Sequence, residues 1–256
     1  MGKKRTLIIS AAVMAIACAG LPALIAVAAP APQQPTATAP DTLIHAGRVL
    51  ADPATGRVLA EQSILVRGGR IVSIAAGYAA PVNGAVVVDL KSSFVLPGLI
   101  DSHVHITGEQ GPDSRVDEFI KTSADQAIDG AGFAVKTLNA GFTTVADLGA
   151  DADAILALRR GIATGIIPGP RIIASAGAIS VHGGHGDANG MPRNMALILR
   201  SPGVCSGADD CARAVRERVR DGADIIKITA TGGVLSNTAA GLAQQFTDAE
   251  LKSIVQ

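Results

Sequence analysis

The sequence has few aromatic side chains and little charge. Phe, Tyr and Trp together make up 2% of its 256 residues, and Trp is absent. Charged residues make up 17%, and 22 basic side chains balance 22 acidic ones, so no surplus of charge favours a nucleic acid or an acidic partner. Hydrophobic residues make up 48%, which excludes the disordered classes. We therefore expect a globular protein with a core of Val, Ile, Leu and Ala and no nucleic-acid partner.

The first 28 residues differ from the rest of the chain. They begin with the basic run 3–5, continue as an apolar stretch, and end in Ala-Val-Ala, a sequence that suits signal peptidase. Gly20 and Pro22 interrupt the apolar stretch, which favours a secretory signal over a membrane-spanning helix. A lipoprotein signal with cleavage before Cys18 is the alternative.

We predict from this segment that the protein is exported, to the periplasm or the extracellular space. Contact with a membrane is then expected only through the signal peptide or a lipid on Cys18. Residues 29–41, rich in Pro, Ala and Thr, are predicted to be a linker. Cys205 and Cys211 can close a short disulfide loop in an oxidising compartment; two unpaired thiols are the alternative.

Two regions with different sequence patterns follow the linker. Residues 42–96 read as short alternating strands separated by turn residues, which favours antiparallel structure and a β-sandwich segment. Residues 97–256 alternate apolar strands with helix-patterned segments around a Gly-rich loop. The strands are expected at 98–105, 141–149, 169–177 and 223–233, the helices at 114–140, 151–165, 209–222 and 246–256, and the loop at 177–207. Thr247, with Glu250 three residues on, is predicted to cap the last helix.

This order of elements predicts an α/β fold with a parallel sheet and helical connections. Four strand–helix repeats suit the first half of a (β/α)₈ barrel. A doubly wound open sheet also fits the order, but no Gly-rich phosphate turn follows the first strand.

The stretch "LPGLIDSHVHI" at 96–106 holds two of the five histidines of the chain. His103 and His105 stand at positions i and i+2 of a predicted strand, so both imidazoles point to the same side. Neutral imidazole is a common zinc ligand. The pair alone is compatible with a metal site at the carboxyl end of the strand and equally with two solvated or hydrogen-bonded histidines.

Lys227 lies in the otherwise apolar stretch "ADIIKITATGG". Burial disfavours its ammonium form and favours the neutral amine. A neutral amine can react with carbon dioxide to form an anionic carbamate, which can bridge two divalent metals. The alternative is a lysine whose charged end reaches the surface and pairs with an acid.

Together these residues resemble the amidohydrolase superfamily. The stretch "VLPGLIDSHVHI" is similar to its first barrel strand, and "GADIIKITATGGVLS" to its fourth. The loops "GHGDANG" and "ATGGVLS" are similar to its imidazolonepropionase-like, Xaa-Pro dipeptidase (prolidase-like) branch. The resemblance implies a TIM barrel joined to an N-terminal β-sandwich. It also implies two zinc ions and the hydrolysis of a C–N bond in a small peptide or N-acyl amino acid by a metal-activated hydroxide.

The resemblance assigns roles to individual residues. His103 and His105 would bind one metal, and a carboxylated Lys227 would bridge both. Asp101 would support the ligands without binding metal itself. Zinc, manganese or another divalent ion would satisfy these donors.

The other three histidines receive weaker assignments. His185 corresponds to a histidine that contacts the substrate, with a loop-ordering hydrogen bond as the alternative. His182 stands where a small hydroxylic residue is expected and receives no role. His45, in the predicted sandwich, is expected to be structural.

Two further metal-binding histidines and the catalytic aspartate of the eighth strand have no counterpart in this sequence. We therefore expect these residues to be the N-terminal portion of a hydrolase and to be inactive by themselves. Two alternatives are a cyclic-amide hydrolase, similar to a hydantoinase or dihydropyrimidinase, and an exported non-catalytic remnant. No sequence feature determines the oligomeric state, so both a monomer and a homo-oligomer are compatible with the sequence.

Overall fold

The computed structural model describes residues 40–234 and 241–256. The predicted signal peptide, Cys18 and nearly all of the predicted linker lie outside the described residues. Within the described part of the chain, every helix is too short or too polar to cross a bilayer.

Residues 42–95 form one four-stranded sheet with the order β3-β2-β1-β4. Its strands are β1 (Thr42–Asp52), β2 (Arg57–Arg67), β3 (Arg70–Ala76) and β4 (Val86–Val95). The pairs β1–β2 and β2–β3 are antiparallel, as the tight turns predict, but β4 runs parallel to β1. The expected antiparallel structure is therefore confirmed for β1, β2 and β3 and is wrong for β4. Tight turns fix only adjacent strands, whereas the longer connection 77–85 carries the chain across the sheet to its other edge.

A bulge shapes the parallel pair of this sheet. The register between β1 and β4 shifts between Ala46 and Arg48, at Gly47. A Cβ on Gly47 would lie 2.0 Å from the carbonyl oxygen of Lys91, so only glycine allows the two backbones to approach this closely. The second layer of the predicted sandwich is not found among the described residues, and side chains such as Ile71 and Val86 are exposed.

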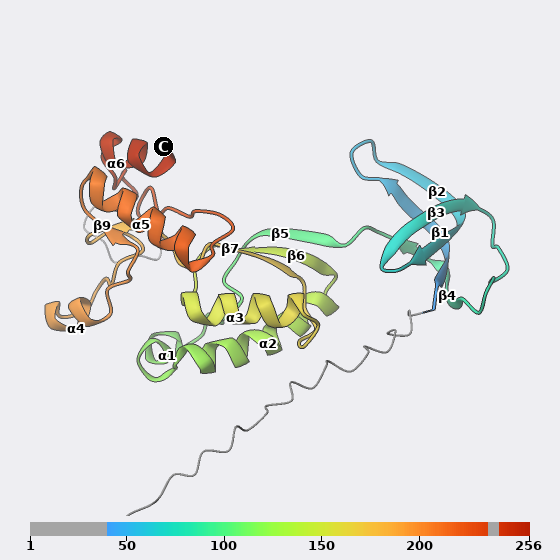
Figure 1. Ribbon diagram of the computed structural model, residues 1–256, viewed down its shortest axis with the longest axis horizontal. Coiled ribbons are helices and arrows are strands. Elements are labelled where there is room, and N and C mark those ends of the chain that lie inside the picture. Colours follow the sequence, from blue (N-terminus) through green and yellow to red (C-terminus); the bar gives the residue numbers. More distant parts are fainter. Residues whose placement is uncertain (1–39, 235–240) are drawn as a thin grey trace, which may run out of the picture.

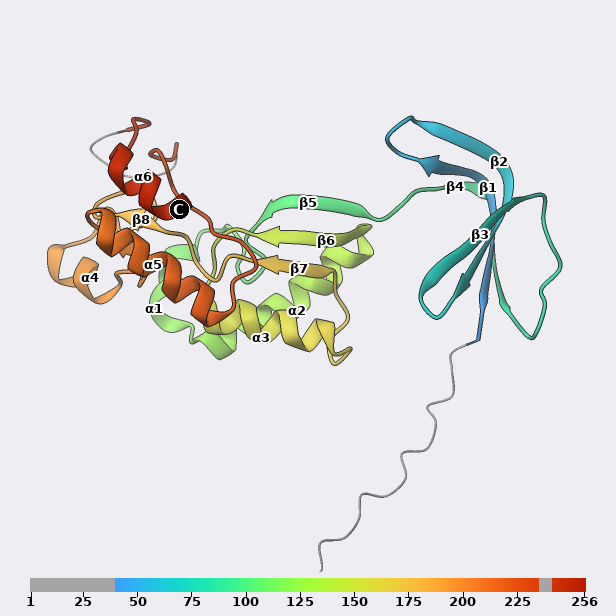
Figure 2. The same ribbon diagram turned by 45° about the horizontal axis from the view of Figure 1, so that its top comes forward.

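The strands β5 (Leu99–Val104), β6 (Phe142–Asp147) and β7 (Arg171–Ala174) form a parallel sheet in that order. The segment 96–98 joins it to the first sheet (Figure 1). The helices α2 (Ser123–Asn139) and α3 (Ala152–Ala163) lie on the same side of this sheet (Figures 1 and 2). Val145, Ile155 and Leu158 are fully buried between these layers. The α/β class is confirmed, and the three strands form an open sheet.

The predicted helix 114–140 is two helices, α1 (Ser114–Ile120) and α2. Lys121 adopts an extended conformation between them, and Thr122 caps α2 in a capping box with Asp125. The Lys121 Nζ lies 2.8 Å from a carboxylate oxygen of Asp117 in α1 and 2.9 Å from one of Asp129 in α2. The capping interaction ends the helical hydrogen bonding that the apolar pattern alone would have continued.

The C-terminal region contains short elements. They are β8 (Ser180–Val181), α4 (Arg193–Ile198), β9 (Val204–Cys205), α5 (Ala208–Asp221) and α6 (Asp248–Val255). The predicted loop 177–207 thus contains a two-stranded parallel sheet and a helix of fewer than two turns. The predicted capping of α6 is confirmed, since the Thr247 side chain accepts from the Glu250 N–H and the Glu250 carboxylate accepts from the Thr247 N–H.

The predicted strand 223–233 is reduced to isolated bridges, one of which joins Ile228 to Ile179. Its backbone pairs with Ala174 at one end and with Ile179 further on. Between these points Ala176 and Gly177 have φ angles of 52° and 98°, so the partner segment leaves the extended conformation and the ladder is interrupted. The strand prediction was therefore wrong in extent.

A second core holds the C-terminal elements together. Cys205 and Cys211 are joined by a disulfide between β9 and the first turn of α5, and both are fully buried. Ile179 and Phe246 pack against them. The buried Glu250 of α6 accepts a hydrogen bond from the N–H of Gly207, directly before α5, so the two helices are linked at their amino ends.

Candidate metal centre

His103 and His105 lie together at the carboxyl end of β5. Their ring centroids are 5.4 Å apart, as expected for side chains on the same side of an extended segment. Both residues are exposed. The His105 Nδ1 lies 2.6 Å from the carbonyl oxygen of Gly149, in the turn after β6.

Lys227 approaches this pair from the segment after α5. It is half-buried, and burial lowers the pKa of its ammonium group. The pKa of His103 is lowered first by partial desolvation of its ring and then by the positive charges of Lys227 and His105, while Asp101 and Asp147 act in the opposite direction. The structure therefore brings the three predicted metal ligands, which lie far apart in the sequence, within electrostatic reach of one another.

Asp101 acts on the backbone of the strand. Its Oδ1 accepts a hydrogen bond of 3.0 Å from the N–H of His103. This hydrogen bond restrains the main chain at His103 and occupies one of the two carboxylate oxygens of Asp101.

Asp147 is a site residue that the sequence reasoning missed. It ends β6, is fully buried, and lies close enough to His105 and His103 for their charges to act on it. Burial raises the pKa of its carboxyl group, against the opposing effect of hydrogen bonds from the backbone N–H groups of Ile106 and Gly149. A lone acid at the end of the apolar stretch "FTTVAD" is the same signal as Lys227 in its own stretch, and it could have been found in that way.

These donors fit part of a metal coordination shell. Two imidazoles and an amine that burial shifts toward its neutral form are suitable ligands for divalent metals, the amine after conversion to a carbamate. In the described part of the chain, no three His, Cys, Asp or Glu side chains gather in an arrangement that could hold a metal ion. The described residues therefore supply fewer donors than a complete zinc site requires.

His185 and His182 lie in the loop after β8. The N–H of His185 donates to the Gln245 side chain over 2.9 Å, and the His182 Nδ1 lies 2.6 Å from the Ser206 hydroxyl. The His185 contact is made by its main chain, so it leaves open both roles considered for the imidazole, substrate contact and a loop-ordering hydrogen bond. His45 is buried in the first sheet, where its Nε2 contacts the Ala79 carbonyl at 2.9 Å, in agreement with the structural role expected for it.

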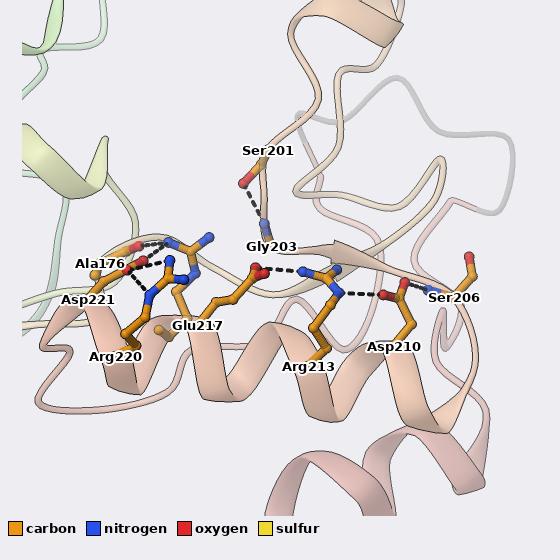
Figure 3. A network of polar contacts seen from close by, with 10 residues as sticks. Ala176, Ser201, Gly203, Ser206, Asp210, Arg213, Glu217, Arg220 and Asp221 are labelled. Carbon is orange, nitrogen blue, oxygen red and sulfur yellow. Dashed lines mark hydrogen bonds and ion pairs between the residues drawn. The ribbon is translucent and has the colours of Figure 1, made fainter.

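Polar contacts along α5 anchor this loop region (Figure 3). The Arg218 Nη1 donates to the Ala176 carbonyl over 2.6 Å, where the chain turns after β7. At the other end of the helix, an Asp210 carboxylate oxygen accepts from the Ser206 N–H, and its second oxygen accepts from the Arg213 guanidinium. The segment between β7 and α5 is therefore fixed at both of its ends.

A cavity of about 790 Å³ lies between the start of α3 and the end of α5. Both acidic and basic side chains line it, among them Asp151, Asp153, Arg160 and Arg218. None of the predicted ligands lines this cavity, so it is separate from the histidine pair.

Comparison with known sequences identifies the family. The profile described as "Amidohydrolase family" matches residues 94–256, which include the histidine pair and Lys227. The chain belongs to the amidohydrolase family. The resemblance of its strand motifs to this family is thereby confirmed.

Two solved structures and one curated enzyme show how this amidohydrolase relates to others. A Xaa-Pro dipeptidase with bound methionine is 37% identical, with a TM-score of 0.74, and the match covers 84% of this chain and 53% of that one. A prolidase complexed with N-methylphosphonate-L-proline is 31% identical, with a TM-score of 0.70, and the match covers 84% and 52%. Ochratoxinase from Aspergillus niger is 30% identical over an alignment of 235 positions, which covers 84% of this chain and 47% of that enzyme. The chain thus spans about half the length of these relatives.

Proposed function

We propose that this chain carries the first metal ligands of a metal-dependent hydrolase that cleaves C–N bonds, with Xaa-Pro dipeptides or N-acyl amino acids as substrates. The observation that carries the proposal is the convergence of His103, His105 and Lys227 at one end of the β5–β6–β7 sheet. The similarity to a Xaa-Pro dipeptidase and a prolidase supports the substrate class. Ochratoxinase, among the relatives, supports the wider class of hydrolases.

The proposal gives each ligand a role that follows from its chemistry. Divalent metals, two zinc ions in the preferred form, would polarise the scissile carbonyl and lower the pKa of water at the site. His103 and His105 present their rings on one side of the strand and donate through imidazole nitrogen. Asp101 holds the backbone N–H of His103 and so restricts the position of that ring.

Lys227 takes part as a carbamate in this proposal. Its neutral amine adds to carbon dioxide, one C–N bond forms, and one proton is released to solvent. The product is an anion with two oxygen donors, and its formation is favoured where burial lowers the pKa of the ammonium group.

Three further parts of the proposal concern the surroundings of the site. The β5–β6–β7 sheet with α2 and α3 is the beginning of a (β/α)₈ barrel, and the β1–β4 sheet is one layer of a sandwich. His185 contacts the substrate from the loop after β8. The N-terminal segment directs the protein out of the cytoplasm, and the disulfide suits such a compartment.

Metal content tests the ligand assignment. The chain is produced with zinc and bicarbonate, and its zinc is measured by elemental analysis beside His103→Asn, Lys227→Ala and the control His182→Asn. We expect the first two variants to lose zinc that the control retains, because His182 contacts Ser206 and is not one of the proposed ligands. Equal zinc in all four proteins contradicts the assignment. A carbamate signal in ¹³C NMR under labelled bicarbonate, absent in Lys227→Ala, tests the modification directly.

Substrate class is tested on the whole protein that contains these residues. Its metal-loaded form is assayed with Xaa-Pro dipeptides, N-acyl amino acids and a dihydropyrimidine. Hydrolysis of the first two classes is expected. Hydrolysis of the dihydropyrimidine alone would favour the cyclic-amide alternative, and no hydrolysis with metal bound would favour the non-catalytic remnant.

A further inference from the structure

Asp147 is a buried carboxylate whose two oxygens both accept hydrogen bonds from the backbone. It is fully buried, and a carboxylate in such a position is costly unless its oxygens are well bonded. Its Oδ2 accepts from the Ile106 N–H over 2.7 Å, and its Oδ1 accepts from the Gly149 N–H over 3.1 Å. One carboxylate therefore joins two backbone segments that are separated by more than one helix of sequence.

Both of these segments control His105. Ile106 is its neighbour in the chain, so the first hydrogen bond fixes the main chain that carries the imidazole. Gly149 holds the ring itself, because its carbonyl oxygen lies 2.6 Å from the His105 Nδ1. A carbonyl oxygen can only accept, so Nδ1 carries a proton, and in the neutral ring Nε2 is then the nitrogen with the lone pair.

The turn at Gly149 is also shaped to the ring. A Cβ on this residue would lie 3.2 Å from the His105 Cε1, which is tighter than ordinary contact. The absence of a side chain therefore lets the Gly149 backbone approach the imidazole closely enough for the hydrogen bond.

We propose that Asp147 is a positioning residue that fixes the tautomer and orientation of His105, so that Nε2 is held free toward the metal site. This inference rests on the proposed metal-binding role of His105. The two oxygens of a carboxylate are both acceptors, which the two N–H groups require. An asparagine offers one acceptor and one donor group, so Asp147→Asn removes one hydrogen bond at nearly constant shape.

The tautomer of His105 is the measurement that tests this role, and it needs no metal. We propose two-dimensional ¹H–¹⁵N NMR of histidine-labelled, metal-free protein, comparing wild type, Asp147→Asn and the control Asp151→Asn. Asp151 lies in the same turn but accepts from the Ala154 N–H at the start of α3. His45 serves as an internal reference, since its Nε2 faces the Ala79 carbonyl and it lies in the other sheet.

In wild type and Asp151→Asn, His105 is expected to give the Nδ1–H pattern, and in Asp147→Asn a mixture in which Nε2–H predominates. His45 is expected to be unchanged in all three proteins. A folded Asp147→Asn variant that keeps the Nδ1–H pattern of His105 would overturn the proposal. If that variant does not fold, Gly149→Ala perturbs the other side of the same contact and is expected to change the His105 signals while the carboxylate remains.

Zinc affinity is the second readout. Loss of a group that orients a ligand typically weakens metal binding by about 10- to 100-fold, so Asp147→Asn is expected to bind zinc that much more weakly than Asp151→Asn. Equal affinities would count against the positioning role. Absence of zinc binding in wild type would contradict the proposed function instead, and the tautomer in metal-free protein would still decide whether Asp147 holds the ring.

Discussion

Different interactions stabilise the β5–β6–β7 unit and the C-terminal unit from β8 to α6. In the first, three strands pair in parallel, and α2 and α3 bury Val145 and Ile155 against them. In the second, strand pairing is limited to two-residue segments and isolated bridges. A disulfide, the small apolar core around Ile179 and Phe246, and polar contacts along α5 hold its short elements together.

The candidate metal centre joins these two units. His103 and His105 come from the first, and Lys227 comes from the second, beyond the interruption at Ala176 and Gly177. The two histidines are therefore positioned by a regular sheet, whereas the position of Lys227 depends on contacts between short elements. The three predictions below test this division.

The largest effect is expected in the core of the first unit. Ile155 is fully buried, and its truncation in Ile155→Ala leaves a cavity that is expected to cost about 2–5 kcal/mol of unfolding free energy. The matched control is Ile128→Ala in α2, where the isoleucine is 71% exposed, and its change should stay within about 0.5 kcal/mol. Denaturant unfolding measures both. Similar losses in the two variants would mean that the α3 contacts do not hold this unit.

A smaller effect is expected when the disulfide of the second unit is removed. The two cysteines are six residues apart, and closing so short a loop restricts the unfolded chain by about 2 kcal/mol in the loop-entropy treatment. Replacing both Cys205 and Cys211 by Ala should lower hydrogen-exchange protection in β8, β9 and the start of α5. Protection in β5, β6 and β7 is expected to remain. An equal loss of protection in both units would show that they open together and that the disulfide does not act on the second unit alone.

The smallest effect concerns the pH dependence of the link between α5 and α6. Hydrogen bonds from the backbone N–H groups of Thr247 and Gly207 lower the pKa of Glu250 below its ordinary 4.5. Because the folded-state pKa is lowered, this contribution to stability is present above pH 4.5 and is lost as the pH falls through the lowered value. Glu250→Gln should reduce that acid-dependent loss in unfolding measured between about pH 6 and pH 3.

The control for Glu250 is Glu217→Gln. Glu217 pairs with Arg213 on the surface of α5 and takes no part in the link between the helices. This variant should retain the acid-dependent loss that Glu250 produces. If both variants have the same profile, the link between α5 and α6 does not account for the acid sensitivity.

Local sequence alone determined much of this protein. The two-residue spacing of His103 and His105 places both rings on one side because side chains alternate along a strand. The Thr247–Glu250 capping box and the helix 208–221 follow from residues within a few positions of each other. The strand motifs were also sufficient to indicate the family that the profile match then identified.

Only the tertiary structure decided the features that depend on distant residues. The parallel pairing of β4 with β1 and the break in the strand at 223–233 depend on which segments meet and how their backbones bend. The hydrogen bonds that connect Asp147, Ile106, Gly149 and His105 cross from one strand end to the next turn. Spacing along the chain carries no information about such contacts, because they form only when the sheet brings β5 and β6 side by side.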